Sequence, residues 1–258
     1  MLKRKIYRRL RTLPALFALM AALVHAEEFD PQLMQKRCLF TSQTSKAVSL
    51  GYLLYLPKDY LTQETSRKWP LLLFLHGAGE RGTNLSKVSA HGPPKLAKNK
   101  GELPFIVVSP QCPSGRRWEN DELLALLDDV TARHRVDTRR VYLTGLSMGG
   151  YGTWSLGMSH PERFAAIAPI CGGGDLILGL LPDTKKQAAL KSLPIWAFHG
   201  AKDPVVPVAE SERMIKAAKI AGCKEVQLTV YPEAGHDSWT EAYNDPKLFE
   251  WFLAHARE

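Results

Sequence analysis

The chain has 258 residues, of which 45% are hydrophobic and 23% are charged. This composition is ordinary for a globular protein with an apolar core, and no internal repeat or low-complexity tract interrupts it. The formal net charge is +8, but six of the 34 basic residues lie in the first 26 positions, which carry no acid. The remainder has 28 basic and 26 acidic residues, a net charge of +2. The charge therefore gives no support for binding to nucleic acid.

The first 26 residues have the order of a secretory signal peptide. The basic stretch "MLKRKIYRRLR" precedes the apolar run "LPALFALMAALV", and small residues follow at Val24 and Ala26. The apolar run is shorter than the about 20 residues that a membrane-spanning helix needs. We therefore expect a signal peptide over residues 1–26, a periplasmic or extracellular location, and no membrane anchor after cleavage. An N-terminal membrane anchor is the alternative interpretation.

Four cysteines lie beyond that segment, namely Cys38, Cys112, Cys171 and Cys223. Export would permit disulfides, and four cysteines allow three full pairings. Cys112 and Cys171 both follow predicted strands, so a disulfide involving these two is conceivable, but the sequence leaves the pairing open. No His/Cys pair has the spacing of a zinc site, and we expect no metal.

Short apolar runs that end in glycine or proline alternate with helical patterns along the chain. The predicted strands cover residues 47–57, 69–77, 104–110, 139–145, 164–170, 194–200 and 226–232. The predicted helices cover residues 120–134, 149–158, 208–221 and 246–256. This alternation predicts an α/β fold with a mostly parallel central sheet and helices on both faces. No linker is evident, so we expect residues 27–258 to form one domain, with its site beyond the carboxyl ends of the strands.

One serine lies between glycines in the stretch "VYLTGLSMGGYGTW", residues 141–154. Ser147 follows a predicted strand and precedes a predicted helix, and its Gly-x-Ser-x-Gly pattern occurs once in the chain. A nucleophile elbow needs small residues here, because side chains would collide with the neighbouring strand and helix. The pattern therefore predicts a catalytic serine; the alternative is an ordinary strand-to-helix turn with an unreactive serine.

A serine nucleophile needs a histidine base and an acid that orients it, and in this fold they follow the serine in the order acid, then histidine. His236 lies in the loop "EAGHDSW" after the last predicted strand. A capping or surface position is expected for His160, and a solvated position on the last predicted helix for His255. His199 ends a strand, but no acid-bearing loop separates it from the serine. Asp203, in the preceding loop "AKDPVVP", is the predicted acid. The weaker alternatives for the acid are Asp175, Asp183 and Asp237.

The oxyanion hole should combine the N–H of the residue after the serine with an N–H from the loop after an earlier strand. Met148 supplies the first, and Ala78 in "LHGAGERG" is the predicted second donor. We interpret His76 as a structural residue that braces this loop. Trp118, in "PQCPSGRRWEND", is predicted to form an aromatic wall of the substrate pocket, although simple packing of the loop is the competing interpretation.

These segments together resemble the α/β-hydrolase superfamily. The resemblance rests on "LHGAGERG", "GLSMGGYGTW", "HGAKDPVVP" and "AGHDSWTEAYNDP", and it extends from about Gly51 to the C-terminus. More narrowly, the chain is similar to the secreted esterases often labelled predicted peptidases, relatives of feruloyl and acetylxylan esterases, polyhydroxyalkanoate depolymerases and the phospholipase/carboxylesterase group. The resemblance implies a serine carboxylesterase without a cofactor, in which Ser147 attacks the acyl carbonyl, His236 transfers the proton and Asp203 orients the imidazole.

The interval from Cys171 to Leu193 has only 23 residues, too few for a large cap domain. We therefore expect an open cleft that admits bulky or polymer-linked esters, with feruloyl and acetyl esters of carbohydrates as candidates. Two alternatives remain: an exported serine peptidase of prolyl-oligopeptidase type, which would lack its propeller domain, and a non-catalytic binding protein with a hydrolase fold. The physiological ester, the acyl length and the oligomeric state stay open.

Overall fold

The computed structural model describes residues 26–30, 35–39, 47–62, 64, 66–100 and 102–258. Two compact units, residues 1–47 and 48–258, make up the chain. In the first unit, β1 (Ala26–Asp30) pairs with β2 (Gln35–Leu39) as an antiparallel two-stranded sheet. The predicted signal peptide lies almost wholly outside the described residues, and its cleavage stays a prediction. No helix in the described part of the chain is long and apolar enough to cross a membrane.

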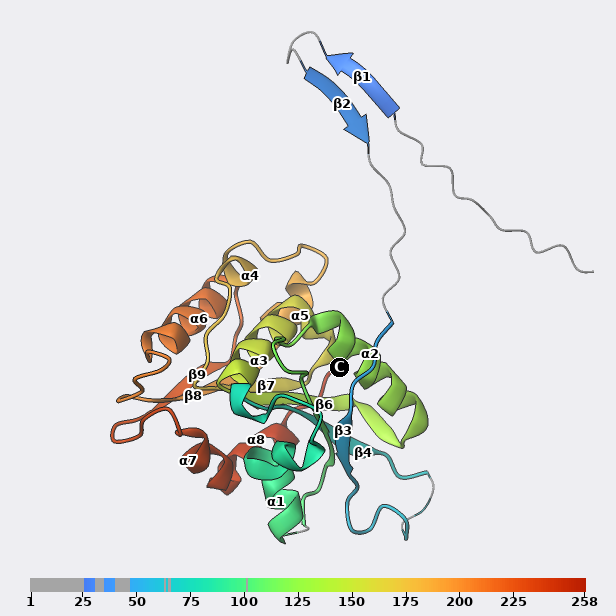
Figure 1. Cartoon of the computed structure of the whole chain (residues 1–258), viewed down its shortest axis with the longest axis vertical. Helices are drawn as coiled ribbons and strands as arrows, with labels where there is room; N and C mark the ends of the chain where they lie inside the picture. The colour runs from blue at the N-terminus through green and yellow to red at the C-terminus, as the bar shows by residue number, and fades with distance from the viewer. Residues whose placement is uncertain (1–25, 31–34, 40–46, 63, 65, 101) are drawn as a thin grey trace, which may run out of the picture. The chain divides into compact units, whose positions relative to one another are not determined.

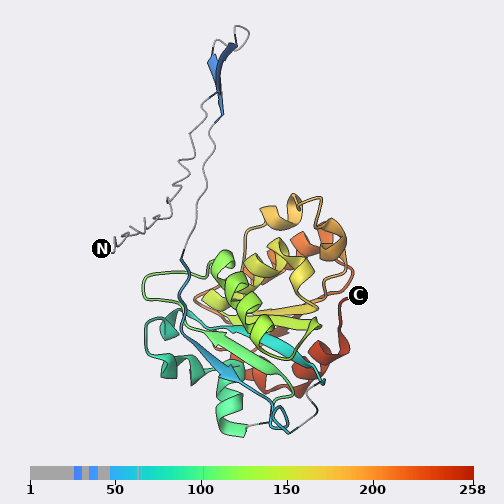
Figure 2. The same ribbon diagram turned by 90° about the vertical axis from the view of Figure 1, so that its right-hand side faces the viewer.

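A twisted sheet forms the centre of the second unit (Figures 1 and 2). Within the described residues it has seven strands in the order β3-β5-β4-β6-β7-β8-β9. Their bounds are β3 Tyr52–Tyr55, β4 Trp69–Leu75, β5 Ile106–Pro110, β6 Val136–Leu146, β7 Ala166–Ile170, β8 Ile195–Gly200 and β9 Val226–Tyr231. The edge strand β3 runs antiparallel to β5, and the other neighbours are parallel. The predicted mostly parallel sheet is confirmed.

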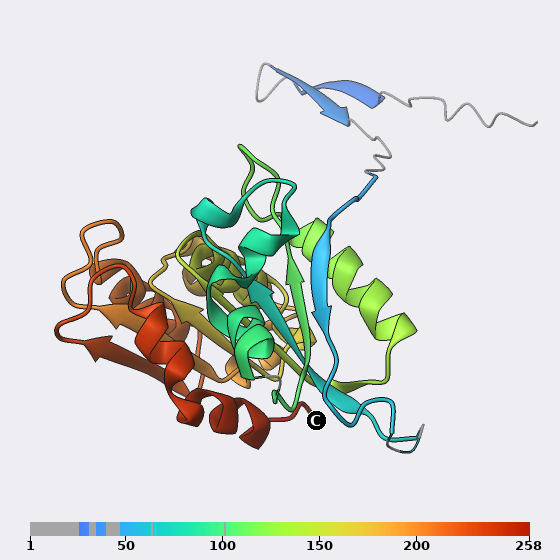
Figure 3. The same ribbon diagram turned by 60° about the horizontal axis from the view of Figure 1, so that its bottom comes forward.

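Helices cover both faces of this sheet, as predicted (Figure 1). One layer contains α2 (Asn120–Arg133), α3 (Met148–Ser159) and α6 (Ala209–Ile220), with the short helices α4 (Ile177–Leu180) and α5 (Gln187–Lys191) beside them. The other layer, which faces the viewer in Figure 3, contains α1 (Gly92–Lys100), α7 (Trp239–Asn244) and α8 (Pro246–Ala254). Short 3-10 turns cover Ala78–Glu80, Leu85–Ala90 and Pro161–Arg163.

Strand β4 shows why the sequence requires two helix layers. All seven of its residues are buried, and successive side chains of a strand point to opposite faces. Leu73 packs in the cluster that includes Trp154 of α3, whereas Phe74 packs in the cluster that includes Phe252 of α8. A continuous apolar run is stable only where both of its faces are covered.

The predicted strands and long helices are all present, with differences of a few residues at their ends. Strand β6 begins three residues earlier than predicted, because Val136 pairs with Trp69 at the start of β4. Helices α1, α4, α5 and α7 were not predicted from the sequence. The interval before β8 contains only α4 and α5, and no large cap domain lies there. The sequence predicts a domain over residues 27–258, and the compact unit that contains every predicted site residue begins at Val48.

Candidate active site

Ser147 lies in a sharp turn between β6 and α3. Its φ is 53° and its ψ is −117°, a conformation that side-chain-bearing residues rarely adopt. A Cβ on Gly145 would overlap the carbonyl of Gly149, and a Cβ on Gly149 would overlap the carbonyl of Leu75. The predicted reason for the flanking glycines is therefore confirmed: the backbone segments approach too closely for a side chain at either position.

The structure brings the three predicted catalytic residues together at the carboxyl ends of β6, β8 and β9. His236 Nε2 lies 2.9 Å from Ser147 Oγ, and His236 Nδ1 lies 2.7 Å from Asp203 Oδ2. A carboxylate only accepts hydrogen bonds, so Nδ1 carries a proton and Nε2 is left to accept the serine proton. This is the geometry of a serine nucleophile with its base and orienting acid.

Asp203 is held as an ionised hydrogen-bond acceptor. Its side chain is fully buried, and burial by itself would raise its pKa. The hydrogen bond from His236 and those from the N–H groups of Val206 (2.9 Å) and Val205 (2.8 Å) outweigh burial and hold the pKa below its ordinary value. The acid is therefore charged at neutral pH and can stabilise an imidazolium on His236.

The alternative acids make other contacts. Asp175 accepts from the N–H of Ile177 and Asp183 from the N–H of Lys185, each within its own loop. Asp237 is exposed. Of these acids, Asp203 is the one for which the structure shows a hydrogen bond with His236.

The remaining downstream histidines also have other partners. His160 follows α3 and its Nδ1 lies 3.2 Å from Lys186 Nζ. His255 contacts Glu225 and the carbonyl of Trp251. His199 is fully buried and lies beside Asp203, an arrangement that the sequence did not predict.

The loop after β4 lies against the elbow, as the predicted oxyanion hole requires. A Cβ on Gly77 would lie 3.6 Å from Ser147 Cβ, and Ala78 begins the following 3-10 turn. Met148 is the first residue of α3, and the first N–H groups of a helix have no partner within the helix. Both predicted donors are thus on segments that border the serine, and their role in binding an oxyanion stays a prediction.

His76 braces this loop in the way the sequence predicts. It is 1% exposed, and its Nδ1 donates to the carbonyl of Gly77 at 2.6 Å while its Nε2 accepts from the N–H of Cys112 at 3.0 Å. Burial lowers the pKa of His76, which keeps the ring neutral as these two bonds require. The ring therefore ties the loop after β4 to the loop after β5.

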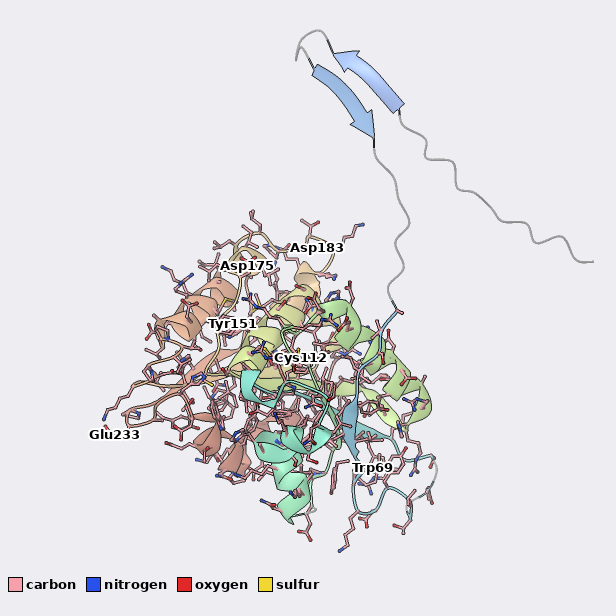
Figure 4. The ribbon with its side chains drawn as sticks, in the orientation of Figure 1. Trp69, Cys112, Tyr151, Asp175, Asp183 and Glu233 are labelled. Atoms are coloured by element: carbon pink, nitrogen blue, oxygen red, sulfur yellow. The ribbon has the colours of Figure 1, made fainter. Side chains whose placement is uncertain are left out.

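A cavity of about 540 Å³ opens beside the elbow helix, within the size range of small-molecule sites. It is lined by Arg117, Trp118, Met148, Tyr151, Gly152, Ser155, Gly174 and Asp175. Tyr151 and Asp175 are labelled in Figure 4. Four of these residues lie on α3 at spacings of three and four, so they share one face of that helix. Tyr151 was not predicted, although its position one turn after Ser147 could have indicated it.

Trp118 both lines the cavity and packs its own loop, and its role as a wall of the substrate pocket stays a prediction. It lines the cavity, and its Nε1 donates a hydrogen bond to the carbonyl of His76 at 3.1 Å. Its ring also packs edge-on against the His76 ring, with the two ring centroids 4.8 Å apart. The same contacts that pack its loop therefore hold the indole at the cavity wall.

Cys112, Cys171 and Cys223 are buried free thiols, so the conceivable Cys112–Cys171 disulfide is not formed. Cys171 lies next to Ser147 instead: its Sγ accepts a hydrogen bond from the N–H of Ser147 at 3.3 Å. Burial raises the pKa of the Cys171 thiol to about 12. The group is therefore a neutral part of the wall behind Ser147.

The sheet order, the elbow and the Ser–His–Asp arrangement define the α/β-hydrolase fold. The model of the dienelactone hydrolase family matches residues 110–247. The chain belongs to the dienelactone hydrolase family.

Several proteins of known description are similar to this chain. A thermostable esterase of known structure is 32% identical, with a TM-score of 0.64 over 91% of this chain and 63% of its own. A bifunctional acetylxylan esterase/xylanase of Neocallimastix patriciarum is 30% identical over 154 residues, which are 57% of this chain and 21% of that protein. A poly(3-hydroxyoctanoate) depolymerase of Pseudomonas fluorescens is 27% identical over 62% of this chain and 63% of its own length. The chain thus spans between a fifth and just under two thirds of these two curated relatives.

A ferulic acid esterase structure has a TM-score of 0.57 at 20% identity, over 89% of this chain and 98% of its own. At that identity the likeness concerns the fold alone.

Proposed function

We propose that this protein is an exported serine hydrolase of carboxylic esters that acts through an acyl-enzyme. The observation that carries the proposal is the position of His236, within hydrogen-bond distance of both Ser147 Oγ and Asp203 Oδ2. The family membership and the esterases among the similar proteins support the same reaction class.

In the proposed reaction, Ser147 Oγ attacks the ester carbonyl while His236 Nε2 takes the serine proton. The oxyanion is stabilised by the N–H groups of Met148 and Ala78, each worth about 3 kcal/mol in comparable sites. The imidazolium then gives its proton to the departing alcohol. Water, activated by the same histidine, hydrolyses the acyl-enzyme and releases the acid.

We infer that the substrate is a bulky ester rather than a small free one, with feruloyl or acetyl esters of carbohydrates as the leading class. The interval between β7 and β8 carries only two short helices and no large cap, which supports access of a bulky ester to the cavity lined by Met148, the residue after Ser147. Trp118 and Tyr151 offer aromatic surfaces, and Arg117 and Asp175 offer polar contacts at the rim. The name of the acetylxylan esterase agrees with this class.

The experiment compares hydrolysis of p-nitrophenyl acetate, butyrate and octanoate with that of methyl ferulate. Ser147→Ala should lower kcat by several orders of magnitude. Ser89→Ala, whose hydroxyl binds the carbonyl of Ser86 on the protein surface, is the matched control and should retain activity. An anilide analogue of the best ester tests amide hydrolysis. A wild-type protein that hydrolyses none of the esters, or a Ser147→Ala variant that retains activity, would refute the proposal.

Export is a separate part of the proposal and rests on the first 26 residues of the sequence. Expression of the full chain in a bacterial host should yield a mature protein that begins near Glu27. An intact mass that includes residues 1–26 would contradict it.

A further inference from the structure

His199 lies at the carboxyl end of β8, four residues before the proposed catalytic acid. Its side chain is fully buried, yet it is not part of the reaction described above. Its Nε2 lies 2.8 Å from the carbonyl oxygen of Val206 and 3.3 Å from Asp203 Oδ2. Both of these atoms only accept hydrogen bonds, so Nε2 must carry a proton.

The other ring nitrogen has a partner as well. His199 Nδ1 lies 2.7 Å from Ser211 Oγ on α6, and this hydroxyl lies 3.0 Å from the carbonyl of Gly172. Ser211 is also fully buried. The His199 ring is therefore held on both sides, by the loop of residues 203–206 at Nε2 and by α6 at Nδ1.

These contacts act on the two oxygens of Asp203 in different ways. Oδ1 accepts from the N–H groups of Val205 and Val206, and the carbonyl of Val206 is in turn held by His199. Oδ2 accepts from His236 and faces the His199 N–H. His199 thus stabilises the loop of residues 203–206 through the carbonyl of Val206. Its N–H also points at Asp203 Oδ2, the oxygen that accepts the hydrogen bond from His236.

We propose that His199 is a positioning residue that holds the Asp203 loop and withdraws charge from Asp203 Oδ2. This inference rests on the proposed triad and adds to it a determinant of the pH at which the base becomes active. Without the His199 N–H, the carboxylate would hold a protonated His236 more strongly. The acid limb of the kcat/KM profile, which reports the titration of the His236–Asp203 pair, would then move to higher pH.

Other titratable groups near this pair do not supply the same effect. Burial raises the pKa of Cys171 at the end of β7, and burial together with the charge of Glu210 raises the pKa of Tyr151 on α3, so both stay neutral in the relevant range. Asp237 is exposed beside His236 and is unchanged in all the variants below. A shift of the acid limb in a His199 variant therefore reports the loss of the His199 N–H.

Two polar substitutions separate the two sides of the ring. In His199→Gln the side-chain amide can reach the position of Nε2 and restore the donor toward Val206 and Asp203. In His199→Asn the shorter amide reaches only the position of Nδ1 and retains the contact with Ser211. We expect His199→Asn to lower kcat about tenfold at neutral pH with little change in KM. It should also move the acid limb up by about one pH unit, the lower end of the effect of one hydrogen bond to a charged group.

His199→Gln should lie close to the wild type in both measurements. Equal effects of the two variants would show a general packing role and overturn the proposal, as would a His199→Asn profile that coincides with the wild type. Ser211→Ala, which disturbs only the Nδ1 side, should lower the melting temperature and leave the acid limb in place.

A measurement without turnover covers the case in which neither His199 variant folds. In wild-type protein with ¹⁵N-labelled histidine, the Nε2 of His199 should carry a slowly exchanging proton throughout pH 5–9. An unprotonated Nε2 would overturn the inference even if the protein hydrolysed esters. Conversely, a protonated Nε2 in a protein that hydrolyses no ester would leave the inference standing and refute only the proposed function.

Discussion

Replacement of Asp203 by asparagine tests the predicted triad through a single atom. The two backbone N–H groups that bind Oδ1, from Val205 and Val206, are fixed donors. The amide oxygen of the asparagine must therefore occupy the Oδ1 position, which places its NH₂ group against His236 Nδ1. Two donors cannot face each other at 2.7 Å, so the imidazole must release its Nδ1 proton and carry the proton on Nε2 instead.

That tautomer cannot accept the proton of Ser147. The loss of kcat expected for a histidine held in the wrong tautomer is roughly 10⁴-fold, equivalent to about 5 kcal/mol of transition-state stabilisation. The shape of the side chain is retained, so we expect the fold to persist. The assay is the kcat of p-nitrophenyl butyrate hydrolysis at neutral pH, together with the melting temperature of each variant.

The matched control is Asp237→Asn, which changes the exposed carboxylate next to His236 in sequence. It should change kcat by less than about threefold, as expected of a surface charge near the site. A folded Asp203→Asn variant that retains more than a tenth of the wild-type kcat would contradict the proposed role of Asp203. Equal losses of activity in the two variants would contradict it as well.

The pKa of Asp203, the backbone contacts of Gly149 and the position of Trp118 at the cavity give three further predictions. The pKa of Asp203 is lower in the folded chain than in the unfolded chain. Its contribution to stability is therefore complete above about pH 4 and is lost as the pH falls through the pKa of the folded state. The free energy of unfolding in urea, measured between pH 5 and pH 2, should depend less on pH in Asp203→Asn than in the wild type. Gly149→Ala should yield little soluble protein, since its Cβ would overlap the Leu75 carbonyl, and normal expression with normal activity would contradict this. Trp118→Ala should lower kcat/KM about tenfold for methyl ferulate and much less for p-nitrophenyl acetate, because only the larger acyl group reaches the indole ring. An equal loss of kcat/KM for both esters would show that Trp118 only packs its loop.

Strong local signals explain what could be predicted from the sequence. The continuous apolar run of β4 predicts a strand that is buried on both faces. The glycines around Ser147 are required because neighbouring backbone segments leave no room for a side chain. His236 and Asp203 could be identified because parallel strands bring their following loops to the same edge of the sheet. The unpredicted helix α1 begins "GPP", which is typical of a turn, although proline is also favoured in the first turn of a helix.

Local sequence patterns and the general geometry of parallel sheets are enough to predict the α/β class, the order of the main elements and the three residues proposed as serine, base and acid. The side chains that surround these three residues become apparent only in the folded chain. His199 joins Asp203 to Ser211, Cys171 lies behind Ser147 as a free thiol, and Tyr151 faces the cavity. These contacts form between strands and helices distant in sequence, and no local pattern specifies the distance between two side chains that different elements carry.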